Sequence, residues 1–281
     1  MPATYRFTQL DVFTDTPLRG NPLAVVHDAT DLAPDEMLRF TEWTNLSEAT
    51  FLLPPTDPRA DYRVRIFTPG RELPFAGHPT LGSCHAWLAA GGIPKRERIV
   101  QECGAGLVEI RRDAASGRLA FAAPPLQDRG RLGDADLDAI AACLGIARSD
   151  IVDHAWCVNG PEWRVVLLRS AAEVLALRPD PALLQGMDLG VVGPHPAGAD
   201  ARFELRSFFP GNQGLTEDPV TGSLNAGVAQ WLIESGRAPD RYVAAQGTAL
   251  GRAGRIVVER DGADIWIGGH RVTVVEGHVT L

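Results

Sequence analysis

The sequence predicts an α+β protein made of two similar halves, each with several strands around one apolar helix. The main observation is a motif, E-x-P-x-x-G-x-x-x-x-G, that occurs at residues 72–82 and again at 217–227. Equivalent positions are always 145 residues apart, as 217 − 72 and 227 − 82 show, which is about half of the 281-residue chain. In addition, an apolar segment with a tryptophan follows each copy, and the strands are grouped rather than alternating regularly with helices.

In the first half, apolar alternation or short apolar runs predict strands near 5–12, 23–26, 50–53, 62–66, 108–110 and 119–121. A helix is expected from Pro34 to Trp43, because proline and acids occupy its first turn. The first motif copy leads into the apolar segment Cys84 to Ala90, which predicts a buried helix ending near Gly91. The last two strands form a hairpin around 114–117.

The second half begins after a polar, proline-containing stretch at 122–133. Apolar residues at i, i+3, i+4 and i+7 predict a helix from Leu137 to Leu144, which Gly145 ends. Strands are expected near 155–158, 163–168, 203–205, 241–245, 256–258, 265–267 and 272–275, with helices near 171–177 and 228–233. The expected domains are therefore 1–123 and 130–281, with the last strand free to return to the first domain.

Composition excludes several classes of function. The net charge is −8 with both signs interspersed, which argues against nucleic acid as a partner. No apolar run is long enough for a membrane span, and the first residues lack the pattern of a signal peptide, so we expect a cytoplasmic protein without a membrane partner. The four cysteines are widely spaced, so neither a zinc site nor a redox pair is indicated.

The two motif copies each predict a turn that feeds the N-terminus of a buried helix. Backbone N–H groups at such a terminus lack partners within the helix and attract anions, and glycine lets a ligand approach closely. Gly77-His78 and Gly222-Ser223 are therefore candidates for holding a carboxylate or phosphate. The alternative is structural: both glycines only permit tight helix entry, and Ser223 is an ordinary N-cap. The duplication favours the anion site.

Two carboxylates lie near these turns. Asp218 precedes the second turn and would either cap the helix or orient a substrate. Glu48 lies between a helix and an apolar strand, where a partly apolar cleft would raise its pKa and suit acid/base work. The structural alternative for Glu48 is a capping box with Asn45, three residues earlier.

Other chemistries find little support. His78 and His85 are seven residues apart on the expected helix, but no third ligand accompanies them, so no metal site is predicted. The serines lack a hydrolase elbow, and no dinucleotide-binding fingerprint occurs.

The chain resembles the PhzF family of isomerases from phenazine biosynthesis over nearly its whole length. The motifs that carry the resemblance are Leu10-Asp11-Val12-Phe13-Thr14, Gly20-Asn21-Pro22-Leu23-Ala24-Val25, Asn45-Leu46-Ser47-Glu48-Ala49-Thr50-Phe51, Ile66-Phe67-Thr68-Pro69, Glu72 to Gly82, Asn159-Gly160-Pro161, Glu217 to Ser223 and Gln246-Gly247. The resemblance implies a diaminopimelate epimerase-like fold, with two pseudo-symmetric domains, each a curved sheet wrapped around a central helix. It also implies an active site in the cleft between the domains, and a homodimer.

The same resemblance implies roles for individual residues. The family's catalytic glutamate falls on Glu48, and its other site residues fall on His78, Asp218 and Ser223, with backbone amides at Gly77 and Gly222. Ser47, beside Glu48, is added to the expected substrate-binding residues. The family's best-known member isomerises a dihydro-hydroxyanthranilate without metal or organic cofactor.

One departure from the wider fold bears on the reaction. Related epimerases and racemases use two cysteines, one at each turn, and the corresponding positions here are Ala76 and Thr221. Racemisation by two cysteine bases is therefore not expected. The segment Leu224-Asn225-Ala226-Gly227 also departs from the phenazine enzyme, so the substrate need not be the same.

The function predicted from the sequence is a cofactor-independent isomerase that moves a proton within a small carboxylate substrate. Glu48 is the expected acid/base, with His78 and Asp218 orienting substrate and proton. The alternatives are a racemase or epimerase with Glu48 as one of two bases, and a non-catalytic protein that binds a small metabolite.

Overall fold

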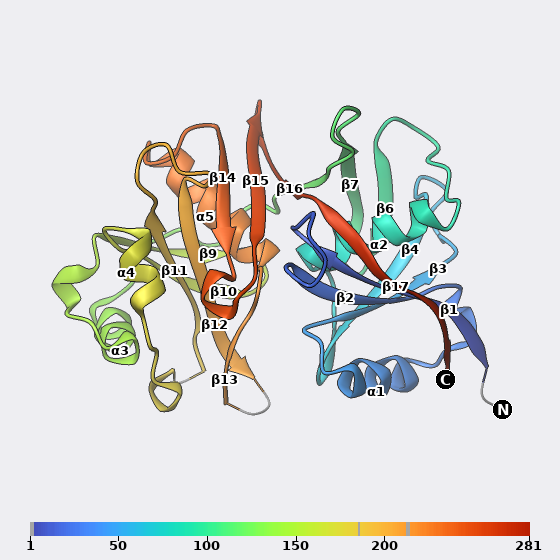
Figure 1. Cartoon of the computed structure of the whole chain (residues 1–281), viewed down its shortest axis with the longest axis horizontal. Coiled ribbons are helices and arrows are strands. Elements are labelled where there is room, and N and C mark those ends of the chain that lie inside the picture. Colours follow the sequence, from blue (N-terminus) through green and yellow to red (C-terminus); the bar gives the residue numbers. More distant parts are fainter. Residues whose placement is uncertain (1–2, 185, 212–213) are drawn as a thin grey trace. The chain divides into compact units, whose positions relative to one another are not determined.

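The protein divides into two compact units. The computed structural model describes residues 3–184, 186–211 and 214–281. Unit 1 contains the chain up to Ala122 together with Gly268–Leu281, and unit 2 contains Ala123–Ile267 (Figure 1). Residues 268–281 thus belong to unit 1; the domain expected from the sequence ran from 130 to 281, with its last strand free to return to the first domain.

Unit 1 is rich in strands. Its strands are β1 (Thr4–Val12), β2 (Asn21–Val26), β3 (Ala49–Leu53), β4 (Tyr62–Thr68), β5 (Arg71–Leu73), β6 (Ile99–Cys103), β7 (Gly106–Arg112), β8 (Leu119–Ala122) and β17 (Arg271–Thr280). Its helices are η1 (Ala29–Asp31), α1 (Pro34–Thr44) and α2 (Gly77–Ala89).

Unit 2 has a similar composition. Its strands are β9 (Asp153–Val158), β10 (Glu162–Leu167), β11 (Asp188–Pro194), β12 (Phe203–Gly211), β13 (Gly214–Glu217), β14 (Arg241–Gln246) and β15 (Gly254–Asp261). Its helices are α3 (Asp134–Leu144), η2 (Arg148–Asp150), α4 (Ala171–Ala176), η3 (Pro181–Leu183), α5 (Gly222–Glu234) and η4 (Thr248–Leu250). Strand β16 (Asp264–Gly269) runs across the boundary between the units.

The strands of both units pair in the same order. In unit 1, β1–β2, β3–β4, β4–β5 and β6–β7 pair antiparallel, while β2–β3 and β4–β6 pair parallel. In unit 2, β9–β10, β11–β12, β12–β13 and β14–β15 pair antiparallel, while β10–β11 and β12–β14 pair parallel. The parallel pairs occur where a helix connects the two strands, as parallel pairing requires a crossover. The predicted α+β fold with two similar, mostly antiparallel units is confirmed.

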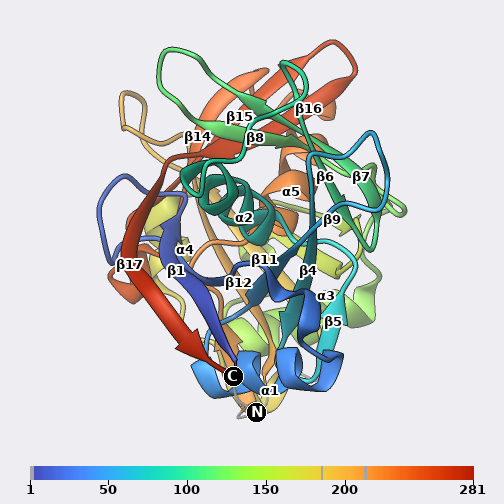
Figure 2. The ribbon, with the colours of Figure 1, turned by 90° about the vertical axis from the view of Figure 1, so that its right-hand side faces the viewer.

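A buried helix follows each copy of the repeated motif. Helix α2 packs against β1, β2, β3, β4, β8 and β17 (Figure 2), and α5 packs against β9 and β10. Most residues of both helices are buried, as expected for a helix with apolar residues on all sides. The other helices cover outer faces: α1 contributes Met37 and Phe40 to a core cluster of unit 1, and α3 contributes Leu137 and Ile140 to one of unit 2.

The first residue of each motif copy closes the hairpin that precedes the buried helix. Glu72 accepts two hydrogen bonds from the guanidinium of Arg65, at 2.8 and 2.6 Å. Glu217 accepts two from Arg206, at 2.8 and 2.7 Å. Such two-pronged contacts fix the geometry of both groups, so the repeated glutamate is a structural residue in both units.

The last glycine of each motif copy lets the helix approach a strand. A Cβ atom on Gly82 would lie 2.4 Å from Leu23 Cδ2, and one on Gly227 would lie 2.8 Å from Cys157 Cβ. Because real Cβ atoms do not come so close, the motif requires glycine at these positions. Among the residues that the structure describes, no helix is long and apolar enough to cross a membrane.

Candidate active site

In unit 1, Glu48 lies just before β3, in the connection that follows α1. Asn45 is the C-cap of α1 and has a left-handed backbone with φ of 56°. The residue therefore ends a helix, and Glu48 leads into a strand. The alternative capping box of Asn45 and Glu48 is wrong. The side chain of Glu48 is 16% exposed.

His78 occupies the first turn of α2 and faces Glu48. Its Nε2 lies 3.4 Å from Glu48 Oε2, and its side chain is 4% exposed. Burial lowers the pKa of His78 from 6.5 to about 3, because the charged imidazolium would lose its hydration. The ring is therefore neutral at physiological pH and carries one ring proton.

A third polar residue completes this group. The amide nitrogen of Asn21, at the start of β2, lies 3.3 Å from His78 Nδ1. Asn21 is fully buried. The sequence suggested only a turn at this position, although Asn21 belongs to a motif that the resemblance includes.

The N-terminus of α2 is formed by small residues. Ala76 is the N-cap, and Gly77 is the first helical residue and is buried. Ser47 is half-buried in the connection before β3, and its carbonyl oxygen accepts a hydrogen bond of 3.0 Å from Thr68 Oγ1. Unit 1 thus brings Glu48 and His78 together, with Gly77 adjoining His78 in the chain.

In unit 2, Asp218 is held by a network of buried side chains. Thr221 Oγ1 donates to Asp218 Oδ2 at 2.6 Å and lies 2.6 Å from Ser207 Oγ. Gln246 Nε2 donates to Thr221 Oγ1 at 2.9 Å and to Ser207 Oγ at 3.1 Å. The hydroxyl of Thr221 is therefore committed to three neighbours, and its proton points at the carboxylate.

Gly222 and Ser223 begin α5, and Thr221 is its N-cap. The alternative assignment of Ser223 as the N-cap is therefore wrong. Ser223 Oγ accepts a hydrogen bond of 3.1 Å from Trp163 Nε1, which leaves its own proton to be donated. The carbonyl oxygen of Ser223 accepts one of 2.8 Å from Asn159 Nδ2.

The repeat extends to a pair of glutamines that the motif does not contain. Gln101 Nε2 donates to Thr80 Oγ1 at 3.0 Å, and Gln246 Oε1 accepts from Asn225 Nδ2 at 2.8 Å. These pairs are again 145 residues apart, since 246 − 101 and 225 − 80 both give 145. In each unit, a buried glutamine on the strand after the helix therefore anchors the first turn of that helix.

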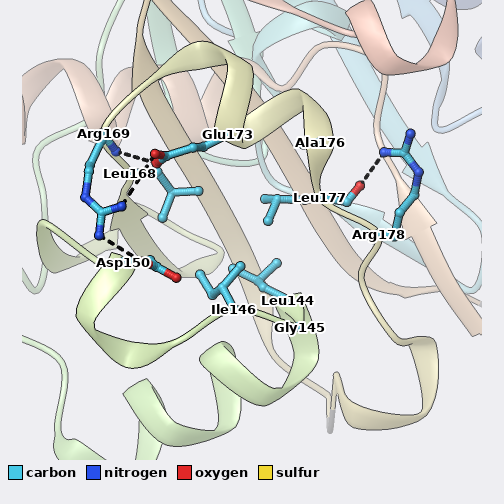
Figure 3. A pocket seen from close by; sticks show the side chains of 10 residues that line it. All are labelled: Leu144, Gly145, Ile146, Asp150, Leu168, Arg169, Glu173, Ala176, Leu177 and Arg178. Carbon is cyan, nitrogen blue, oxygen red and sulfur yellow. Dashed lines mark hydrogen bonds and ion pairs between the residues drawn. The ribbon is translucent and has the colours of Figure 1, made fainter.

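A cavity elsewhere in unit 2 lacks comparable chemistry. It has a volume of 410 Å³ and lies among α3, η2 and α4 (Figure 3). Its charged rim is paired: Arg169 lies 2.8 Å from Asp150 and 3.6 Å from Glu173. Its floor is apolar, with Leu144, Leu168 and Leu177. The polar groups at the start of α2 in unit 1 and at the start of α5 in unit 2 are therefore the stronger candidates, each within its own unit.

The described residues contain no cluster of His, Cys, Asp and Glu side chains arranged to hold a metal ion. His85 Nε2 lies 2.9 Å from Thr273 Oγ1, so the two histidines of α2 have different partners. The cysteines are free thiols, and burial raises the pKa of Cys84 and Cys157 to about 12.

The chain thus has a two-unit α+β fold, in which unit 1 places the carboxylate of Glu48 beside His78 at the start of a buried helix. A family model described as phenazine biosynthesis-like protein matches residues 10–277. The chain belongs to this family, and it is an isomerase of a small molecule.

Individual relatives match the chain over nearly its full length. The chain is 36% identical to antisense-enhancing sequence 1 of Schizosaccharomyces pombe, over 97% of this chain and 98% of that protein. It is 34% identical to the trans-2,3-dihydro-3-hydroxyanthranilate isomerase of Pseudomonas aeruginosa, over 97% of this chain and 94% of that enzyme. Among solved structures, a PhzF-family protein of Bacillus anthracis superposes with a TM-score of 0.84 at 23% identity, over 99% of both chains.

Proposed function

We propose that this protein is a cofactor-independent isomerase that moves a proton between two carbon atoms of a small carboxylate substrate, with Glu48 as the acid/base. The observation that carries the proposal is the close approach of Glu48 Oε2 to His78 Nε2, 3.4 Å, at a largely buried position. A carboxylate that is partly removed from water is a stronger base than one in solution.

In the proposed step, Glu48 takes a proton from one substrate carbon, and the electrons of the broken C–H bond move into the substrate's double-bond system. Glu48 then returns the same proton to another carbon, so that the double bond moves and the substrate neither gains nor loses an atom. His78 stays neutral throughout, because its pKa is about 3. It therefore does not compete with Glu48 for the proton.

We assign the capacity to bind a carboxylate to the N-terminus of α2 in unit 1 and, separately, to the N-terminus of α5 in unit 2. Gly77, Gly222 and Ser223 would donate hydrogen bonds there, and the helix dipoles favour an anion. Ser47 is assigned to the same task. Asp218, oriented by the hydroxyl of Thr221 at 2.6 Å, would orient the substrate.

The racemase alternative is less well supported. A two-base racemase needs a second group that can hold and release a proton. At the two N-caps, Ala76 has no titratable group, and the hydroxyl of Thr221 is already committed to Asp218, Ser207 and Gln246. A binding protein without catalysis would leave the buried pair of Glu48 and His78 without a purpose.

Substitution of the acid/base tests the proposal. In Glu48→Gln, we expect turnover to fall by at least about 1,000-fold, because an amide cannot accept the substrate proton. Substrate binding should change by less than about threefold, since the shape of the side chain is kept. The first substrate to try is trans-2,3-dihydro-3-hydroxyanthranilate, because relatives are named as its isomerases. Calorimetry measures its binding.

The matched control is Glu42→Gln, which changes an exposed acid on α1. Its activity should equal that of the wild type. The activity of the wild-type protein should also survive dialysis against EDTA. Undiminished turnover in Glu48→Gln would remove Glu48 from the mechanism, and loss of activity on dialysis would refute cofactor independence. The homodimer implied by the resemblance and the cytoplasmic location expected from the sequence remain part of the proposal.

A further inference from the structure

The two ring nitrogens of His78 face groups of opposite hydrogen-bonding character. Nδ1 lies 3.3 Å from the amide nitrogen of Asn21, which can only donate. Nε2 lies 3.4 Å from a carboxylate oxygen of Glu48, which accepts when ionised. A neutral imidazole has one N–H and one lone pair, so these neighbours distinguish its two tautomers.

Only one tautomer satisfies both neighbours. With the proton on Nε2, the N–H faces the carboxylate of Glu48, 3.4 Å away without hydrogen-bond geometry in this structure, and Nδ1 accepts from Asn21. With the proton on Nδ1, two N–H groups would face each other on one side, and a lone pair would face the carboxylate on the other. Turning the Asn21 amide over would relieve the first conflict but not the second. The surroundings of His78 therefore select the Nε2–H form.

The backbone around Asn21 holds its amide in place. Asn21 pairs with Val12 across the β1–β2 ladder and is 0% exposed. Pro22, the next residue, restricts the backbone of Asn21 to extended conformations. Gly20, on the other side, is packed so tightly that a Cβ would lie 2.3 Å from the carbonyl oxygen of Val12. The Gly20-Asn21-Pro22 segment thus presents a fixed amide to His78.

We propose that Asn21 is a positioning residue that keeps His78 in its Nε2–H tautomer and thereby directs the single imidazole proton at Glu48. Its catalytic consequence rests on the proposed function of Glu48. A neutral N–H donor steadies the ionised carboxylate before it takes the substrate proton. Because the imidazole is not protonated a second time, the proton stays on Glu48 and can be returned to the substrate.

The tautomer is measured directly by NMR of protein labelled with ¹⁵N-histidine. The chain has seven histidines, and the signals of His78 are those missing from the His78→Gln variant. In the wild type, we expect His78 to show a protonated Nε2 and an unprotonated Nδ1 between pH 5 and pH 8. An Nδ1–H form, or a charged ring in this range, would overturn the proposal without any activity measurement.

Two variants of Asn21 separate positioning from packing. Asn21→Asp has nearly the same shape but accepts at Nδ1, so it should move the proton to Nδ1 or charge the ring. Asn21→Leu removes the donor that faces Nδ1, so the preference for the Nε2–H form should weaken and an Nδ1–H population should appear. An unchanged His78 tautomer and pKa in a folded Asn21→Asp variant would contradict the proposal.

The effect of Asn21 on turnover should depend on the imidazole ring of His78. Partners that fix the tautomer of a metal-ligating histidine typically change activity about 10- to 100-fold when they are removed, and we use the same range for this ring. We expect Asn21→Asp to lower kcat by this amount with KM changed by less than about threefold. In the His78→Gln background, the same change should cost less than about twofold, because the glutamine amide has no tautomer to fix. Full additivity of the two substitutions would contradict the proposal.

Thr8→Val is the matched control. It removes a buried 2.9 Å hydrogen bond between β1 and another histidine, His27, which directly follows β2. It should leave kcat and the signals of His78 unchanged. If Glu48→Gln retains full activity while His78 is Nε2–H in the wild type, the proposed function fails but the tautomer assignment stands. If His78 is Nδ1–H while Glu48→Gln is inactive, the tautomer assignment alone fails.

Discussion

At the scale of single residues, buried hydrogen bonds fix the positions of the polar side chains in each unit. The hydroxyl of Thr221 donates to Asp218 while Ser207 and Gln246 contact it. Hydrogen bonds in series strengthen one another at low dielectric. Unit 2 therefore holds a carboxylate at a fixed position, whereas unit 1 places Glu48 beside a neutral imidazole.

The buried imidazole of His78 makes stability depend on pH. Its pKa is lowered from 6.5 to about 3. Between these values the unfolded chain binds a proton that the folded chain excludes, so the free energy of unfolding falls as the pH drops below 6.5. The loss attributable to His78 should be on the order of 2 kcal/mol by pH 5. Above pH 7 this contribution is constant.

Urea unfolding of the wild type and His78→Gln at pH 5 and pH 7 measures this effect. The variant should lose less stability on acidification than the wild type, because only the wild type must exclude a proton there. His27 and His85, whose pKa values are also lowered by burial to about 4, remain in both proteins and cancel in the comparison. Equal losses in the two proteins would show that His78 is protonated without cost in the folded state.

At the scale of elements, each buried helix is placed by the glycine at the end of its motif. Gly82 allows α2 to lie against Leu23, and Gly227 allows α5 to lie against Cys157. Because each helix begins with residues that we propose bind substrate, a shift of its axis moves the groups at its own N-terminus. Packing in the core and geometry at the site are therefore linked through one element.

Alanine at these glycines should destabilise the protein. Within a helix, alanine is more favourable than glycine by roughly 1 kcal/mol. The added methyl group, however, would overlap Leu23 or Cys157. We expect Gly82→Ala and Gly227→Ala each to lower the free energy of unfolding by about 1–3 kcal/mol, as overpacking does. Gly277→Ala is the control, since nothing lies within 4 Å of a Cβ there. Gly82→Ala with wild-type stability would show that the strand yields without cost.

The sequence predicted the elements better than the contacts of the site. The offset of 145 residues and the apolar helices were visible because they depend on local pattern. The contact of Asn21 with His78 joins residues 57 positions apart, which no spacing rule reports. The capping-box interpretation of Glu48 failed because an i, i+3 pattern also arises where a helix ends, as the left-handed Asn45 shows.

At the scale of the whole chain, the two units differ in how the chain builds them. Unit 2 is one continuous segment, 123–267, whereas unit 1 needs residues 268–281 from the end of the chain. Strand β17 pairs with β1 along all of β1, from Thr4 opposite Thr280 to Val12 opposite Arg271. Without β17, the hydrogen-bonding edge of β1 would be open to solvent or to other chains.

This difference predicts how fragments fold. Residues 123–267 expressed alone should show a cooperative urea transition by circular dichroism, because their core is contained in the segment. Residues 1–122 should lack such a transition or aggregate, and joining 268–281 to them by a flexible linker should restore it, because β17 covers β1. The control is the same fusion with Val272 and Val279 changed to proline, since proline cannot donate to the ladder. Cooperative unfolding of residues 1–122 alone would show that β17 is dispensable and that unit 1 is complete before the chain has been fully made.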